Sequence, residues 1–266
     1  SIANATNSTV FVAFAMDNAG TSGNHPYTIS GTGLAPVSDG TTGPKQNKWV
    51  PVNNSLRNPS NTANTGVSVL LVKCFLTTAL SSTDQITLQF TSGVNVVSKA
   101  ARVWVVTQGA FLYCGTQQTV VNQGSSSTST STSFGVTTAQ TGTLNIGLIG
   151  WESNQTVNGD TDTTGGSWST FTALVANTGT DTSSITLGTQ YKIGTSTSTQ
   201  TYNNTCGATR NYAGVNSNYT EVNINFLSFS STAGNSTSTG SGSFTSPTTT
   251  ANAQAASGTG TANNAT

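Results

Sequence analysis

The chain has 266 residues and a formal net charge of zero, from eight basic and eight acidic side chains. Nucleic-acid binding needs clustered Lys and Arg, so a net charge of zero argues against a nucleic-acid partner. No apolar run approaches the roughly 18 residues of a membrane-spanning helix. Only 6% of the residues are charged, against 35 Ser, 52 Thr and 27 Asn, whereas an ordinary soluble domain is about a quarter charged. Solubility through hydroxyls and amides indicates an extracellular or virion setting and argues against membrane insertion.

The dominant pattern along the chain is alternation of apolar and polar residues, which is typical of half-buried β-strands. The expected strands, in chain order, are 9–16, 67–75, 86–90, 102–106, 143–149, 169–175, 185–193 and 222–226. Thr and Val favour strands because branching at Cβ suits a pleated surface. No window carries a sustained 3.6-residue apolar stripe. The sequence therefore predicts an all-β fold, a jelly-roll-like antiparallel β-sandwich with an N-terminal arm and a Ser/Thr-rich C-terminal extension.

Composition divides the chain into three parts. Residues 1–64 hold one good strand followed by a loop-rich stretch, residues 65–230 hold most of the apolar residues, and residues 231–266 are of low complexity. The first strand is expected either at the edge of the chain's own sheet or exchanged between subunits. A tail with so few apolar residues cannot offset its ordering entropy alone, so we expect assembly contacts to hold it. Ser1 follows no basic-then-apolar leader, which indicates removal of a signal or numbering from processed material.

Titratable groups that could support catalysis are few. His25 lies in a Gly-Asn-His-Pro-Tyr loop with nothing to mark it as a base. Glu152 follows Trp151 and precedes Asp160 and Asp162, which could suggest a sugar-cleaving carboxylate pair, but the spacing fits a solvated turn better. We predict no catalytic residue and no cofactor. The protein is therefore expected not to be an enzyme.

The strongest metal candidate is the loop Asn158-Gly-Asp-Thr-Asp162, in which Asn158, Asp160 and Asp162 alternate as calcium ligands often do. The bidentate Glu of an EF-hand is missing, so a hydrated turn remains the simpler interpretation. Three cysteines, Cys74, Cys114 and Cys206, allow one disulfide with three alternative pairings, or three buried thiols.

Other residue patterns suggest covalent modification. Lys73 lies inside an apolar run, where it either extends its amine to solvent from an edge strand or forms an isopeptide bond with an Asn near an acid such as Glu221. Asn-x-Ser/Thr sequons are candidate glycosylation sites in a glycosylating host. They occur at Asn4, Asn7, Asn53, Asn154, Asn203, Asn218, Asn235 and Asn264.

Several segments between about residues 84 and 230 resemble strands of β-sandwich modules in tailed-phage tail-fibre, head-fibre and capsid-decoration proteins. These segments are 84–93, 97–106, 142–149, 166–171, 187–194 and 208–215, followed by the strand at 222–226. The resemblance covers a little more than half of the chain and implies a non-enzymatic virion component. The Thr/Asn-rich composition also resembles that of archaeal strand-donating extracellular filament subunits, without a matching motif.

These observations favour a structural or assembly protein on the outside of a particle, most simply a virion capsid-decoration or fibre-type protein. The alternatives are a subunit of an extracellular filament or surface layer, and a carbohydrate-binding module with Trp49, Trp151 and Trp168 as its platform. The expected partners are copies of the chain itself or other virion or filament subunits, with carbohydrate as a further candidate. We expect Phe11, Phe14 and Phe244 to be the assembly contacts, because large interfaces use aromatic anchors.

Overall fold

The computed structural model describes residues 8–17, 38–39, 47, 49–51, 67–80, 86–89, 95–107, 119–137, 141–219, 226–239 and 241–244. Within these ranges the chain forms β-strands and loops, with one turn of 3₁₀ helix, η1 (Asp181–Ser183). The strands are β1 (Thr9–Asp17), β2 (Ser38–Asp39), β3 (Trp49–Pro51), β4 (Val67–Phe75), β5 (Ile86–Gln89), β6 (Asn95–Thr107), β7 (Thr119–Thr137), β8 (Thr143–Trp151), β9 (Val157–Asn158), β10 (Thr172–Ala176), β11 (Ile185–Gly194), β12 (Thr199–Tyr219), β13 (Phe226–Thr239) and β14 (Ser241–Phe244).

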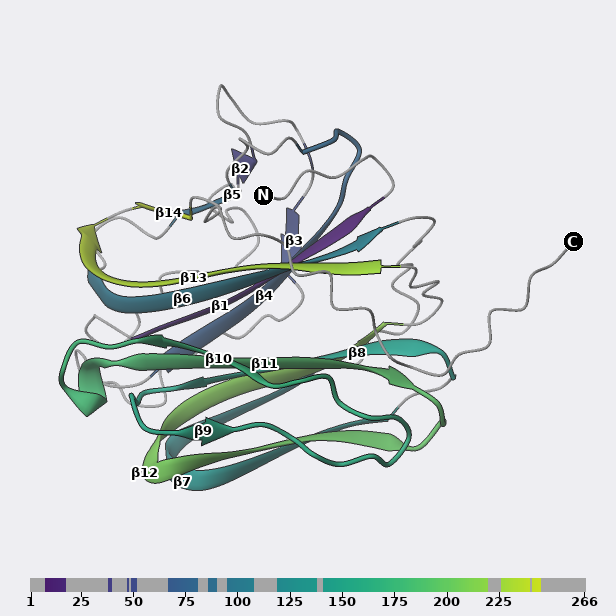
Figure 1. The fold of residues 1–266 in the computed structure, drawn as a ribbon. Helices are drawn as coiled ribbons and strands as arrows, with labels where there is room; N and C mark the ends of the chain where they lie inside the picture. Colours follow the sequence, from purple (N-terminus) through teal and green to yellow (C-terminus); the bar gives the residue numbers. More distant parts are fainter. Residues whose placement is uncertain are drawn as a thin grey trace, which may run out of the picture.

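Two large antiparallel sheets are stacked as layers (Figure 1). The first sheet has the order β13-β6-β1-β4-β3, and the second has the order β10-β11-β8-β12-β7, with β9 paired to β12. A small third sheet, β14-β5-β2, lies above the first sheet in Figure 1. The predicted antiparallel β-sandwich is therefore confirmed.

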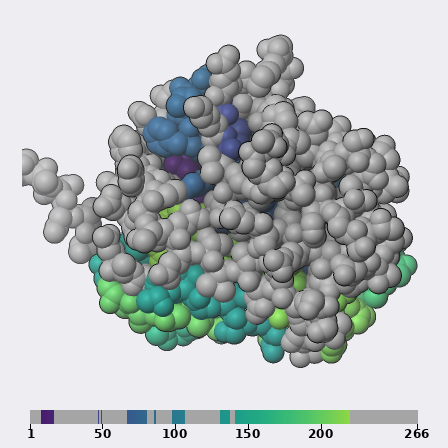
Figure 2. All heavy atoms as spheres, turned by 180° about the vertical axis from the view of Figure 1, so that it is seen from behind, coloured from purple at the N-terminus to yellow at the C-terminus, as the bar shows by residue number. Residues whose placement is uncertain are grey.

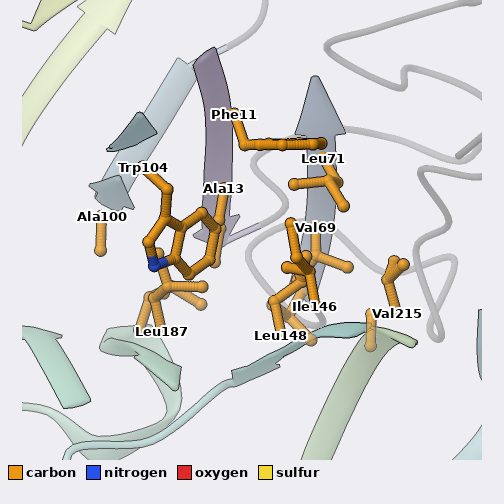
Figure 3. Packing of buried hydrophobic residues seen from close by; sticks show 14 of the residues in the cluster. Phe11, Ala13, Val69, Leu71, Ala100, Trp104, Ile146, Leu148, Leu187 and Val215 are labelled. Atoms are coloured by element: carbon orange, nitrogen blue, oxygen red, sulfur yellow. The ribbon is translucent and has the colours of Figure 1, made fainter. Parts of the chain in front are cut away.

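The main core lies between the two large sheets. Phe11, Leu71 and Trp104 of the first sheet face Leu148 and Leu187 of the second (Figure 3). Burying one such large side chain contributes about 1.5–3 kcal/mol, so this layer is the main apolar contribution to stability. Successive side chains of a strand point to opposite faces of the sheet, so every second residue of these strands points into this core.

The first sheet is buried on both faces. Along β1, Phe11 and Ala13 face the second sheet, whereas Val10, Val12 and Phe14 belong to a separate apolar cluster on the opposite face. That cluster also includes Ile86 of β5, in the small third sheet. Burial on both faces explains why β1 and β4 are apolar almost without interruption.

The order of the strands repeats in the two halves of the chain. In the first sheet β1 lies between β4 and β6, and in the second sheet β8 lies between β11 and β12. The next strand of each half then crosses to the other sheet: β7 pairs with β12, and β13 pairs with β6. Because each half of the chain completes the sheet of the other, the two halves form one domain.

The topology corrects the expected division of the chain. β1 is neither an arm nor an edge strand, because it pairs with β4 on one side and with β6 on the other. The boundary at residue 64 therefore cuts through a sheet. The expected tail, 231–266, begins inside β13, whose residues Ser231 to Asn235 pair with Arg102 to Ser98.

Candidate functional site

The second sheet carries a second layer on its outer face. β12 and β7 run together through two register shifts, and Figure 1 shows them curving together. Residues 199–205 of β12 pair with residues 131–137 of β7, while β9 pairs with Thr205 and Cys206 of β12. We call residues 131–137, 157–158 and 199–206 the folded-back ribbon. Asn216 ties it to the sheet, because its Nδ2 donates 2.9 Å hydrogen bonds to the carbonyl oxygens of Phe134 and Gln200.

Glycines allow the ribbon to approach the sheet closely. A Cβ on Gly147 of β8 would lie 2.6 Å from the ring of Tyr202, and one on Gly214 of β12 would lie 2.6 Å from the ring of Phe134. Aromatic rings fill the resulting space, with the Trp168 and Tyr202 ring centroids 4.8 Å apart. Only glycine leaves room for these rings, so the ribbon is part of the folded core.

Asp160 holds the loop that follows β9 in place through four hydrogen bonds. Its backbone N–H donates to Gln190 Oε1 at 2.7 Å, and its carbonyl oxygen accepts from Gln190 Nε2 at 2.9 Å. Its carboxylate accepts the backbone N–H of Asp162 at 2.6 Å and that of Asn203 at 2.7 Å. The carboxylate of Asp160 therefore connects the loop to the ribbon, and its backbone connects the loop to β11.

This arrangement gives the proposed calcium ligands structural roles. Both carboxylate oxygens of Asp160 accept backbone N–H groups, Asp162 accepts the backbone N–H of Thr164, and Asn158 donates to Thr205 in the ribbon. No group of three or more His, Cys, Asp or Glu side chains able to hold a metal occurs in the described part of the chain. In this structure the three residues stabilise the loop and its contact with the ribbon.

Lys192 is almost fully buried beneath the same loop, at 1% exposed. Its Nζ donates to the carbonyl oxygen of Thr164 at 3.1 Å and lies 4.8 Å from the Trp168 ring centroid. Burial lowers the pKa of Lys192 below its ordinary value, and the charges of Asp162 and Asp160 partly oppose this effect. The buried amine therefore stabilises the loop through its hydrogen bond to the Thr164 carbonyl oxygen.

A second polar cluster joins η1 to the end of β8 and to β12. The Asp181 carboxylate accepts from the Ser153 hydroxyl and the Asn154 backbone N–H, each at 2.8 Å, and forms a salt bridge with Arg210. Burial alone would raise the pKa of Asp181, but these hydrogen bonds and the Arg210 charge together hold it below its ordinary value. Nearby, Glu152 is buried and accepts from Asn211.

The expected tryptophan platform is not formed. Trp151 is fully buried and Trp168 is 9% exposed, with its Nε1 donating to the carbonyl oxygen of Thr201. Trp49 packs against the cluster on the other face of the first sheet. Trp151 and Trp168 are therefore core residues and cannot stack on a sugar in this fold.

Two of the three expected assembly contacts are also core residues. Phe11 and Phe14 are fully buried in separate clusters of the same chain, because β1 is central and covered on both faces. The backbone of Phe244 belongs to β14 and pairs with Ile86. The prediction for Phe11 and Phe14 is therefore wrong, since neither side chain can reach a neighbouring subunit.

The described sequons differ in accessibility. Asn218 is 2% exposed and donates to Asn145 Oδ1 at 3.0 Å, so a glycan cannot be attached in this fold. Asn154 and Asn203 are partly exposed, and Asn235 lies in β13. The remaining predicted sites are outside the described residues; they are Asn4, Asn7, Asn53 and Asn264.

The remaining sequence predictions concern Lys73, the cysteines and the loop histidine. Lys73 is partly buried with its Nζ 5.2 Å from the Tyr219 ring centroid, and burial lowers its pKa. Cys74 and Cys206 carry buried thiols in different apolar clusters, which excludes a disulfide between them. His25, Cys114 and Glu221 lie outside the described residues.

The structure describes the surroundings of nine charged side chains, and each of these nine is buried or partly buried. Five are buried, namely Lys99, Arg102, Glu152, Asp160 and Lys192, and four are partly buried, namely Lys73, Asp162, Asp181 and Arg210. Arg102 lies between the two large sheets and donates to Thr189 Oγ1 at 2.8 Å. Burial lowers its pKa to about 10, against the opposing effects of Tyr202 and Tyr191.

The outward face of the ribbon, by contrast, is uncharged. It carries Ser131, Ser133, Gly135 and Thr137 on β7, and Asn158, Thr199, Thr201, Asn203 and Thr205 on β9 and β12. The Thr137 and Thr199 hydroxyls are hydrogen-bonded at 3.1 Å. Residues 131–137 and 141–219, in teal and green, lie along the lower side of the molecule in Figure 2. We take this neutral face, with the edge of β7, as the candidate functional site.

Sequence reasoning missed this site because 124–133 is nearly pure Ser and Thr and reads as low complexity. The available signal was Phe134 and Val136, which continue the two-residue period beyond that stretch.

Within the described ranges no helix is long and apolar enough to cross a membrane. Comparisons with protein-family models, with curated proteins and with solved structures find no match to this chain.

Proposed function

We propose that this chain is a non-enzymatic structural protein that is displayed on the outside of a particle, as a virion capsid-decoration or fibre-type component. The observation that carries the proposal is the distribution of charge. The nine charged side chains whose surroundings the structure describes are buried or partly buried, while the ribbon presents hydroxyls and amides to solvent.

Such a surface suits dense, repeated display. Proteins with net charge far from zero repel their own copies, whereas a net charge near zero permits close association. Here the formal net charge is zero, and the outward face of the ribbon adds no local charge. Neighbouring copies can therefore pack closely without Coulomb repulsion, and hydroxyls keep the exposed face hydrated.

The proposal is tested by immunogold electron microscopy of intact particles and cells from the source culture. Antibodies against the folded chain should decorate the outer surface of intact virions. Label that appears only after the particles are disrupted, or only inside cells, would contradict the proposal.

The alternative is a subunit of an extracellular filament or surface layer, which the partly exposed sequons at Asn154 and Asn203 would suit. The same micrographs distinguish the two functions, because the label would then follow cell-attached filaments or the cell surface. A mass above 27.0 kDa for the chain, isolated from its source, would support glycosylation.

A further inference from the structure

The inner face of the folded-back ribbon carries polar side chains as well as aromatic rings. Thr132 of β7, and Tyr202 and Asn204 of β12, are 7%, 0% and 1% exposed. The Thr132 and Tyr202 hydroxyls and both polar atoms of the Asn204 amide have no hydrogen-bond partner among the described residues. Buried polar groups in folded proteins are nearly always hydrogen-bonded, either to protein or to ordered water. These polar atoms therefore need a partner that the surrounding described residues do not supply.

The three side chains lie next to one another on the ribbon. Asn204 and Thr132 are directly opposite each other in the ladder between β12 and β7, so their Cβ atoms are about 4.5–5.5 Å apart on the same face. Tyr202 precedes Asn204 by two residues and therefore points to that face as well. Asn204 is also close enough to the Tyr202 hydroxyl to oppose part of the rise in pKa that burial causes. We call the three residues the Asn204 cluster.

The Asn204 cluster has the chemistry of a water site. An amide offers two N–H donors and an acceptor, and each hydroxyl can both donate and accept. None of the three side chains is charged, and the carboxylate oxygens of nearby Asp160 already accept backbone N–H groups, which favours a neutral ligand over an ion. Internal waters typically make about three hydrogen bonds, to buried polar groups that lack other partners.

We propose that the Asn204 cluster binds an ordered internal water molecule, which hydrogen-bonds to the Asn204 amide and to the Thr132 and Tyr202 hydroxyls. Through this water, side chains join β7 to β12 in addition to the backbone ladder, beneath the neutral outward face of the ribbon. The site does not depend on the proposed function, because it lies inside the fold of a single chain.

Two substitutions that each remove one hydroxyl test the proposal by the sign of their effect. Y202F and T132V change the size of the side chain little. A buried hydroxyl without a partner destabilises the folded chain, so its removal would increase stability, whereas loss of a hydroxyl that is bonded to water should raise the unfolding equilibrium constant about fivefold. Urea unfolding of the full chain measures this constant. Wild-type or higher stability of both variants would overturn the proposal.

Thr205 provides the matched control for Thr132. It follows Asn204 on β12, but its side chain is exposed on the outward face, so T205V should change the unfolding equilibrium constant by less than about twofold. An effect of T205V as large as that of T132V would count against the proposal. In the double variant Y202F/T132V the combined effect should be smaller than the product of the single effects, because both remove bonds to the same water molecule. Effects that multiply independently would contradict a shared water.

A high-resolution crystal structure of the full chain locates the water directly. Solvent density is expected within hydrogen-bonding distance, about 2.7–3.2 Å, of the Asn204 amide and of at least one of the two hydroxyls. Direct hydrogen bonds from Asn204 to the Thr132 and Tyr202 hydroxyls, with no solvent density between them, would overturn the proposal.

Discussion

Replacing Gly147 by Ala tests whether the ribbon is packed rigidly against the second sheet. The added Cβ would lie 2.6 Å from the Cγ and Cδ2 atoms of the Tyr202 ring, whereas carbon atoms in contact are about 3.5–4.0 Å apart. The ring would have to move by about 1 Å. It is fully buried, with the Trp168 ring centroid 4.8 Å away and that of Phe134 6.5 Å away, so it cannot turn aside unless the ribbon lifts.

The expected cost follows from overpacking. Inserting a methyl group into a well-packed core costs about 1–3 kcal/mol, partly offset by about 0.4–1 kcal/mol from the lower entropy of the unfolded alanine chain. We therefore expect G147A to lower the free energy of unfolding by about 1–2 kcal/mol, or the melting temperature by about 2–8 °C. Urea unfolding followed by tryptophan fluorescence would measure it.

Gly207 provides the matched control. A Cβ there would meet nothing closer than the Thr156 carbonyl oxygen at 3.6 Å, so G207A should be neutral or slightly stabilising. The cost of G147A should also shrink when Tyr202 is already Ala, because the methyl group then meets no ring. Equal stability of G147A and G207A would refute the packing argument.

Three further changes test other parts of the fold. D181N should be less stable than the wild type at pH 7 by about 1–2 kcal/mol. Because the folded pKa of Asp181 is lowered, the stability difference should shrink as pH falls below the ordinary range of an Asp carboxyl. A difference in urea titrations that does not decrease on acidification would contradict this origin. Burial raises the pKa of Tyr202 and of Tyr219. Their contribution to the free energy of unfolding should therefore be complete below pH 10, and should fall above it by up to about 1.4 kcal/mol per pH unit for each tyrosine. Phenolate absorbance should rise together with unfolding, and ionisation while the circular dichroism stays native would argue against burial. Truncation after Ser230 removes β13 residues that pair with β6 and should destabilise the domain, whereas a wild-type melting temperature would show that this pairing is dispensable.

Local pattern located β1, β4, β8 and β11 but missed β7 and β12, the two longest strands. It also failed where a residue's role depends on its neighbours in space. The alternation from Val10 to Met16 correctly marks β1, but the same residues suggested an exchangeable strand because no sequence pattern reveals that β1 is central. Asp160 and Asp162 resemble metal ligands, because alternating carboxylates also form turns that accept backbone N–H groups. Gln190 carried no signal, although it closes the loop at Asp160.

The sequence by itself determines the all-β class, the scarcity of charge and the positions of strands such as β1, β4, β8 and β11, because alternation and composition are local properties that one strand expresses alone. The tertiary structure decides the crossing of β7 and β13 between the sheets, the closure of the ribbon over Gly147 and Gly214, and the burial of Trp151, Trp168, Phe11 and Phe14. These features depend on which strands become neighbours. Asp160, Asp181 and Lys192 are buried or partly buried because the loops and strands around them provide hydrogen-bonding partners, and the outward face of the ribbon presents neutral hydroxyls.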